Sequence, residues 1–192
     1  AILAQGGATS DDLAALWRHP KLLFSQTCWG PMEMGLAAHV RVIGQPDYSA
    51  YEGGEGEHYA SAIVIRGSGH EPAPADGRAV VPLSLLRGAR FAFNGRDSMS
   101  GILALAGDLE AEGESLDVFA SRAETGSHRA SALAVAGGRA DVAAIDCRTW
   151  TLFRRFEPEA AGALRVVGWT ARRKGLPYVT ARHTPDDLVD TL

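Results

Sequence analysis

The sequence predicts an α/β fold in two lobes, because two hydrophobic patterns alternate along the chain. Short apolar or β-branched runs, such as residues 59–66 and 141–145, are typical of buried strands. Longer segments with capping residues, such as residues 98–112 and 127–137, are typical of helices. Strands that alternate with helices form largely parallel sheets with helices on both faces. We therefore expect each lobe to be a mostly parallel sheet flanked by helices.

In the first half of the chain, composition marks each element. Acidic residues in its first turn favour a helix at 11–18, and Ile63, Val64 and Ile65 favour a strand. The expected helices are 11–18, 31–38 and 83–86, the expected strands are 22–25, 41–44 and 59–66, and the loops rich in glycine are 49–58 and 67–78.

In the second half, glycine and proline mark the helix ends. Gly137 and Gly138 end one helix, and Thr184 and Pro185 suit the cap and first position of the last one. The expected helices are 98–112, 127–137, 149–156 and 184–192, and the expected strands are 90–94, 115–120, 141–145, 164–170 and 177–180.

The composition limits the class of protein. The chain has 192 residues, of which 46% are hydrophobic and 22% charged, as in globular domains. The net charge of -4 and the pI of about 5.9 give no global basic field, so we expect no nucleic-acid partner. No apolar run approaches the roughly 18 residues of a membrane span, so we expect no direct membrane insertion. No signal peptide is visible at the start of the chain, which leaves the compartment open.

Ser98, Ser100 and Gly101 form the first candidate site. They follow the apolar strand 90–94 and begin a helix. The carboxyl end of a parallel strand is where α/β sheets bind ligands. The N–H groups of a helix start, together with two hydroxyls, suit phosphate-type oxygens. The alternative is a plain serine cap without a ligand.

Ser127 and His128 repeat this arrangement after the next expected strand. Ser127 is a natural helix cap, and His128 in the first turn could donate a hydrogen bond to an oxyanion. The alternative for His128 is an ordinary surface or hinge residue. Since two helix starts in one doubly wound sheet can converge, we expect them to share one cleft.

Three further residues are candidates for ligand contact. Asp146 follows the buried strand 141–145, where a carboxylate would favour a protonated oxyanion or an ammonium group, or would simply cap the next helix. Gln26 lies in the polar segment that ends the strand 22–25. Tyr59 begins the strand after the glycine-rich loop, and either closes over a ligand or packs inside the protein.

Motifs for catalysis and cofactors are absent from the sequence. There is no G-x-S-x-G, H-E-x-x-H, P-loop or G-x-G-x-x-G pattern, so we expect no enzyme, no cofactor and no metal. Cys28 with His128 as base is the one nucleophile that the sequence offers, and nothing aligns the two. Cys28 and Cys147 lack metal-ligand spacing, and two free thiols are the expected state rather than a disulfide.

An ordered set of motifs resembles the phosphate/phosphite/phosphonate-binding family of ABC-transporter substrate-binding proteins. Its parts are Ser25-Gln26-Thr27-Cys28, residues 94–101, residues 125–131, Ala144-Ile145-Asp146-Cys147 and residues 175–180. The resemblance implies a type II periplasmic-binding fold with two crossover strands, here 59–66 and 164–170, and a ligand clamped between the lobes. It implies lobe 1 from residues 1–62 and 171–192 and lobe 2 from residues 63–170.

The resemblance also implies the function. We expect a substrate-binding protein for a small phosphonate-like or phosphate-like anion, with the membrane subunits of an ABC transporter as partners and a periplasmic or cell-envelope location. Family members begin with a strand and helix before residue 11, so we expect the first lobe to be incomplete in this sequence. Two alternatives stay open, a cytoplasmic effector-binding domain of a regulator and an enzyme that uses Cys28.

Overall fold

The computed structural model describes residues 10–67, 69 and 71–192, and they form two compact units. The larger unit is Asp47–Lys174, and the smaller one combines the chain up to Pro46 with Gly175–Leu192. The expected division lay after residues 62 and 170 instead. The expected first lobe also included residues 1–9, which lie outside the described residues.

The smaller unit is built on a three-stranded sheet of order β1-β11-β2, in which both pairings are antiparallel. Leu22, Met32, Leu36, Val40 and Val179 form its core. The expectation of a mostly parallel sheet is wrong for this unit. Its elements are α1 (Ser10–Trp17), β1 (Ser25–Gln26), α2 (Trp29–Glu33), η1 (Leu36–Ala38), β2 (Val40–Gly44), β11 (Tyr178–Ala181) and α8 (Asp186–Val189).

Three local predictions need correction in the smaller unit. The strand expected at 22–25 is reduced to β1, and the helix expected at 31–38 is interrupted at Gly35, whose φ of 102° only glycine adopts easily. Pro185, not Thr184, occupies the cap position of α8. The Thr184 hydroxyl instead lies 2.8 Å from the Thr180 hydroxyl, which removes it from the cap.

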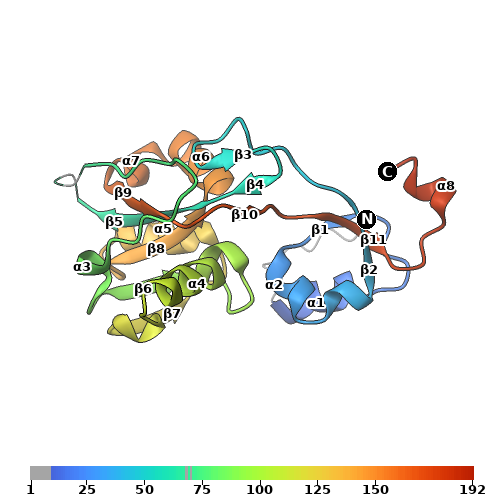
Figure 1. Cartoon of the computed structure of the whole chain (residues 1–192), viewed down its shortest axis with the longest axis horizontal. Helices are drawn as coiled ribbons and strands as arrows, with labels where there is room; N and C mark the ends of the chain where they lie inside the picture. The colour runs from blue at the N-terminus through green and yellow to red at the C-terminus, as the bar shows by residue number, and fades with distance from the viewer. Residues whose placement is uncertain (1–9, 68, 70) are drawn as a thin grey trace. The chain divides into compact units, whose positions relative to one another are not determined.

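The larger unit contains a five-stranded sheet of order β7-β6-β8-β5-β9 (Figure 1). Strands β7, β6 and β8 are parallel, whereas β5 is antiparallel to both β8 and β9. A small second sheet has the order β10-β4-β3. The strands are β3 (Gly54–Glu55), β4 (His58–Tyr59), β5 (Ser61–Arg66), β6 (Arg90–Phe93), β7 (Ser121–Glu124), β8 (Val142–Asp146), β9 (Leu164–Trp169) and β10 (Arg173–Lys174).

Helices cover both faces of the five-stranded sheet, as the α/β prediction requires. The face that carries Ile63, Ile65 and Ala144 packs against α3 and α4 through Leu86, Leu105 and Leu109. On the other face, α5 and α6 contact the central strands β5 and β8. The helices are α3 (Leu83–Leu86), η2 (Met99–Leu103), α4 (Ala104–Ala111), η3 (Leu116–Val118), α5 (His128–Ala136), α6 (Cys147–Phe156) and α7 (Pro158–Gly162).

Two predictions in this unit were wrong in detail. The strand expected at 115–120 is the 3-10 turn η3, because the Ser115 hydroxyl accepts a hydrogen bond from the Asp117 N–H at 3.1 Å and caps the turn. The helix expected at 98–112 is divided into the π-helical turn η2 and the regular helix α4.

Aromatic packing explains why residues 47–60 belong to the larger unit. The Tyr48 and Tyr59 rings stack with their centroids 5.3 Å apart, and both side chains are buried. A Cβ on Gly53 would lie 2.5 Å from the Trp169 ring, so the loop lies tightly on β9. As a result, both expected crossover strands, now β5 and β9, lie within this unit.

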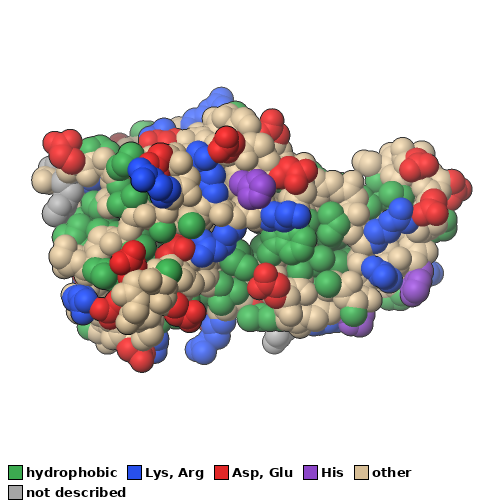
Figure 2. Space-filling model, viewed as in Figure 1, with side chains coloured by type: hydrophobic (Ala, Val, Ile, Leu, Met, Phe, Trp, Pro, Cys, Tyr) green, Lys and Arg blue, Asp and Glu red, His purple; other side chains and the backbone are tan. Residues whose placement is uncertain are grey.

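The surface carries charges of both signs. Acidic and basic side chains are interspersed over the face shown in Figure 2. No helix in the described part of the chain combines the length and the apolar character that crossing a membrane would require.

Candidate ligand-binding site

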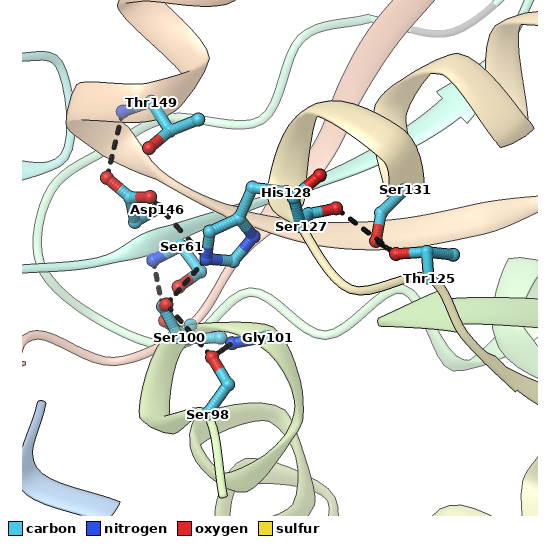
Figure 3. Close-up of polar contacts among 11 residues, drawn as sticks. Ser61, Ser98, Ser100, Gly101, Thr125, Ser127, His128, Ser131, Asp146 and Thr149 are labelled. Carbon is cyan, nitrogen blue, oxygen red and sulfur yellow. Dashed lines mark hydrogen bonds and ion pairs between the residues drawn. The ribbon is translucent and has the colours of Figure 1, made fainter. Parts of the chain in front are cut away.

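The parallel strands β7, β6 and β8 end at the same edge of the sheet, and a helical segment begins after each of them. The segments are α5 after β7, η2 after β6 and α6 after β8. Figure 3 shows side chains from all three starts in one cluster. The convergence of helix starts expected from the sequence is therefore present in the structure.

Ser98, Ser100 and Gly101 form the η2 side of this cluster. The Ser98 hydroxyl accepts a hydrogen bond from the Gly101 N–H at 3.0 Å and lies 3.5 Å from the Ser100 hydroxyl. All three residues are buried. A Cβ on Gly101 would lie only 1.7 Å from Asn94 Oδ1, so this turn requires glycine for close approach of the neighbouring side chain.

His128 joins the three helix starts. Its Nε2 lies 2.8 Å from the Ser100 hydroxyl and 3.5 Å from Asp146 Oδ2 (Figure 3). Burial lowers the pKa of His128 below its ordinary value, while the Asp146 carboxylate and the Ala144 backbone act in the opposite direction. With burial as the largest effect, the imidazole is neutral at neutral pH.

Asp146 serves two neighbours at once. Its Oδ1 accepts a hydrogen bond from the Thr149 N–H at 2.8 Å and so caps α6, as the sequence suggested. Its Oδ2 is directed to His128. Only 7% of the residue is exposed. A buried carboxylate beside a neutral imidazole is suited to accept a hydrogen bond from a protonated ligand oxygen or from an ammonium group.

Ser127 lies at the exposed rim of the cluster. Its hydroxyl accepts a hydrogen bond from the Ala130 N–H at 3.1 Å and caps α5. Next to it, the Thr125 and Ser131 hydroxyls pair at 2.7 Å and tie the turn to the helix. The hydroxyl hydrogen of Ser127 is therefore available to a further acceptor, because its oxygen is acting as the acceptor for the helix.

Gln26 and Tyr59, the other two predicted ligand contacts, lie on other elements of the fold. Gln26 belongs to the smaller unit, where its side-chain N–H donates to the Leu176 carbonyl at 3.1 Å. Tyr59 is in the larger unit, where the residue is 3% exposed and its ring stacks on Tyr48. The Tyr59 ring therefore packs inside the larger unit, and ligand contact by Gln26 or Tyr59 stays a prediction.

Ser61 and Thr170 are part of the cluster that sequence reasoning missed. The Ser61 N–H donates to the Thr170 hydroxyl at 2.8 Å, and both residues are 0% exposed. Ser61 opens the apolar strand β5 and pairs with Asp146 across the sheet. The sequence does show a hydroxyl at the start of a strand whose apolar residues are buried. It does not show that this strand pairs with β8, which is what places Ser61 opposite Asp146.

The geometry offers no support for a cysteine nucleophile. Burial and the neighbouring Asp146 raise the pKa of Cys147 to about 12, so it is a thiol at neutral pH. Cys28 is in the smaller unit and His128 in the larger one, so neither unit contains the pair. Within the described ranges, no group of three or more His, Cys, Asp or Glu side chains is arranged to hold a metal ion.

Comparison with solved structures shows the fold. PhnD1 from Prochlorococcus marinus, solved in complex with methylphosphonate, matches 90% of this chain with 19% identity and a TM-score of 0.68. A binding protein component of an ABC phosphonate transporter from Pseudomonas aeruginosa matches 94% with 17% identity and a TM-score of 0.68. A Xanthomonas citri protein bound to chloride matches 95% with 18% identity and a TM-score of 0.67.

These matches confirm the α/β fold of the type II periplasmic-binding class. The chain spans 61%, 57% and 65% of the length of the three proteins, in the same order. A search of curated proteins gave no match.

Structural similarity shows the fold, and a match to a family model shows the family. The model described as ABC transporter, phosphonate, periplasmic substrate-binding protein matches residues 32–192. That range contains the whole cluster around His128 and most of the motifs that carried the resemblance. This is a family of transport proteins rather than enzymes. The chain belongs to the family of periplasmic substrate-binding proteins of phosphonate ABC transporters.

Proposed function

We propose that this chain binds a small phosphorus oxyanion, of the phosphonate or phosphate type, at the cluster in the larger unit and supplies it to an ABC transporter. The observation that carries the proposal is the meeting of Ser100, His128 and Asp146 from three helix starts, at 2.8 Å and 3.5 Å. Membership of the phosphonate-binding family supports the same ligand class.

The donors of the cluster suit an oxyanion. The N–H groups at the start of a helix carry partial positive charge and lack helical partners. The Ser98, Ser100 and Ser127 hydroxyls and the His128 imidazole add donors on neighbouring elements. We infer that these groups replace the hydration shell of the ligand oxygens, and that the Ser100–His128 contact gives way to contacts with the ligand.

Asp146 sets the selectivity in this proposal. A carboxylate repels a fully deprotonated oxyanion but accepts a hydrogen bond from a P–OH group or an ammonium group on the ligand. Sulfate at neutral pH has neither group. We therefore infer preference for a singly protonated phosphorus oxyanion, or for a phosphonate that carries an amine, over sulfate.

Membership of the family supports a proposal on partners and location. We propose that the membrane subunits of an ABC transporter receive the ligand from this protein and that the protein acts in the periplasm or cell envelope. Gln26 and Tyr59 are further proposed ligand contacts, Tyr59 as an aromatic side chain that closes over the ligand.

A thermal-shift screen tests the proposed function. The probes are methylphosphonate, phosphite, phosphate, 2-aminoethylphosphonate and sulfate, each in large excess. A bound ligand stabilises the folded state, so at least one phosphorus oxyanion should raise Tm by several degrees and sulfate should not. Ser100→Ala and His128→Ala should remove the shift.

Ser115→Ala is the matched control for this screen. It also removes a serine cap, but at η3, which precedes the amino end of β7 rather than following its carboxyl end. This variant should keep the full shift. A protein that responds to none of the phosphorus oxyanions would contradict the proposed function.

A further inference from the structure

The Ser61 hydroxyl is buried and makes no hydrogen bond within the described part of the chain. The residue is 0% exposed, and its Oγ has no hydrogen-bond partner among the residues that the structure describes. Its backbone N–H is already satisfied by the Thr170 hydroxyl at 2.8 Å, and its carbonyl accepts from the Thr170 N–H at 3.0 Å. Buried hydroxyls are almost always hydrogen-bonded, so an orphan of this kind needs an explanation.

The strand register places this hydroxyl at the candidate site. Ser61 and Asp146 are directly opposite each other in the antiparallel pair of β5 and β8. Side chains of opposite residues project from the same face of a sheet, with Cβ atoms about 5 Å apart. Because Asp146 directs Oδ2 to His128 at 3.5 Å, Ser61 projects on the side of the sheet that carries this contact. Figure 3 shows Ser61 grouped with Asp146, His128 and Ser100.

The neighbouring serine and aspartate oxygens have partners, and the Ser61 hydroxyl does not; among the described residues, His128 Nδ1 and Asn94 Oδ1 are also buried without a partner. Ser98 accepts from the Gly101 N–H, Ser100 pairs with His128, and Asp146 holds the Thr149 N–H. All of them lie at or just after the carboxyl ends of β6, β7 and β8. Ser61 instead comes from the amino end of β5, which runs antiparallel to β8 and so begins at the same edge.

We propose that Ser61 is a further ligand-binding residue, whose hydroxyl donates a hydrogen bond to an oxygen of the bound oxyanion. The proposal rests on the proposed function and deepens it. A hydroxyl donor directly across from the Asp146 acceptor gives the site a donor and an acceptor about one strand spacing apart. That pair matches a ligand that presents an unprotonated oxygen beside a protonated one, as a singly protonated phosphonate or phosphate does.

Ser61→Ala tests the proposal because it should weaken anion binding without lowering the stability of the free protein. Removing a hydroxyl that has no partner in the protein does not weaken the free protein, so its Tm should stay equal or rise. The dissociation constant for methylphosphonate, phosphite or phosphate, measured by titration calorimetry on the full chain, should rise about tenfold or more. Ser61→Cys keeps the shape and a weak donor, so its dissociation constant should fall between those of the parent and Ser61→Ala.

Ser115→Ala is the control. The Ser115 hydroxyl is bonded to the Asp117 N–H at 3.1 Å, at η3 and away from the cluster around His128. This variant should lower Tm and leave the dissociation constant within about twofold. Equal affinity of Ser61→Ala and the parent for every probe, or a lower Tm with unchanged affinity, would overturn the role of Ser61 alone. A parent protein that binds none of the probes would overturn the proposed function as well.

Discussion

At the scale of single residues, His128 has the most interconnected position in the candidate site. Its Nε2 contacts Ser100 from η2 and Asp146 from β8, while the residue itself begins α5. Burial, the largest effect on its pKa, keeps the ring neutral. A neutral ring can donate one hydrogen bond without adding a fixed charge to the site, which leaves the charge of the bound ligand to be balanced by helix starts and hydroxyls.

The lowered pKa of His128 predicts a specific loss of stability in acid. Below about pH 6.5 the unfolded chain binds a proton at this residue while the folded protein does not, so the free energy of unfolding falls as the pH drops toward the folded pKa. His128→Gln removes this titration. Urea unfolding at pH 7.5 and pH 5.5 should show a smaller acid loss for the variant than for the parent, by at most about 1.4 kcal/mol per pH unit. Identical pH dependence in both proteins would contradict the burial of a neutral imidazole.

Gly101 carries a second prediction at this scale. In Gly101→Ala the new Cβ would lie 1.7 Å from Asn94 Oδ1 and 3.0 Å from Ser98 Oγ, so the turn must shift. We expect a loss of about 1–3 kcal/mol in the free energy of unfolding, together with weaker anion binding. Denaturant unfolding and calorimetry measure the two effects.

The control for this substitution is Gly162→Ala in α7, where an added Cβ meets nothing within 4 Å. It should cause no loss of stability. Equal stability of Gly101→Ala and the parent would show that the η2 turn is not as tight as described.

At the scale of elements, the sequence predicted the buried strands best. The segments 90–94, 141–145 and 164–170 correspond closely to β6, β8 and β9, whose apolar runs leave little ambiguity. Strand β7 was displaced in the prediction because all four of its residues, Ser121–Glu124, are exposed, so no apolar run marks it. The antiparallel pairing of β5 with β8 is determined by tertiary packing rather than by local sequence. For this reason Ser61 could not be predicted as a neighbour of Asp146.

A buried ion pair should hold α4 against the chain that follows β9. The Asp108 carboxylate accepts from Arg173 Nη2 at 2.8 Å and from the Ala171 N–H at 2.9 Å, and its side chain is 6% exposed. Asp108→Asn would leave the guanidinium without its charged partner and should lower the free energy of unfolding by about 2–3 kcal/mol. Chemical denaturation measures this loss.

Asp117→Asn provides the comparison for Asp108→Asn. Asp117 pairs with Arg122 at 3.2 Å, but its side chain is 85% exposed, so solvent screens the interaction. The two variants should differ clearly in denaturation midpoint. Equal midpoints would mean that the Asp108 pair does not hold α4 in place.

At the scale of the whole molecule, the fold class and the meeting of three helix starts were predictable, because parallel strands end at one edge of a sheet. The positions of Ser98, Ser100, Gly101, Ser127, His128 and Asp146 in the larger unit follow from that rule. The division of the chain into units did not follow, since it depends on the packing of Tyr48, Gly53 and Tyr59 within the larger unit. The roles of Gln26 and Tyr59 were inferred from their places at strand ends, and such a place does not determine which way a side chain points.

The measurement that tests the central claim most directly is calorimetric titration of the full chain and of His128→Ala with methylphosphonate. The account predicts saturable binding by the parent and a dissociation constant at least tenfold higher for His128→Ala, because the variant loses a buried hydrogen bond to an anionic ligand. Saturable binding of equal strength by both proteins would contradict the placement of the site at the His128 cluster. Absence of binding to the parent, with methylphosphonate and with phosphite and phosphate, would contradict the proposed ligand class itself.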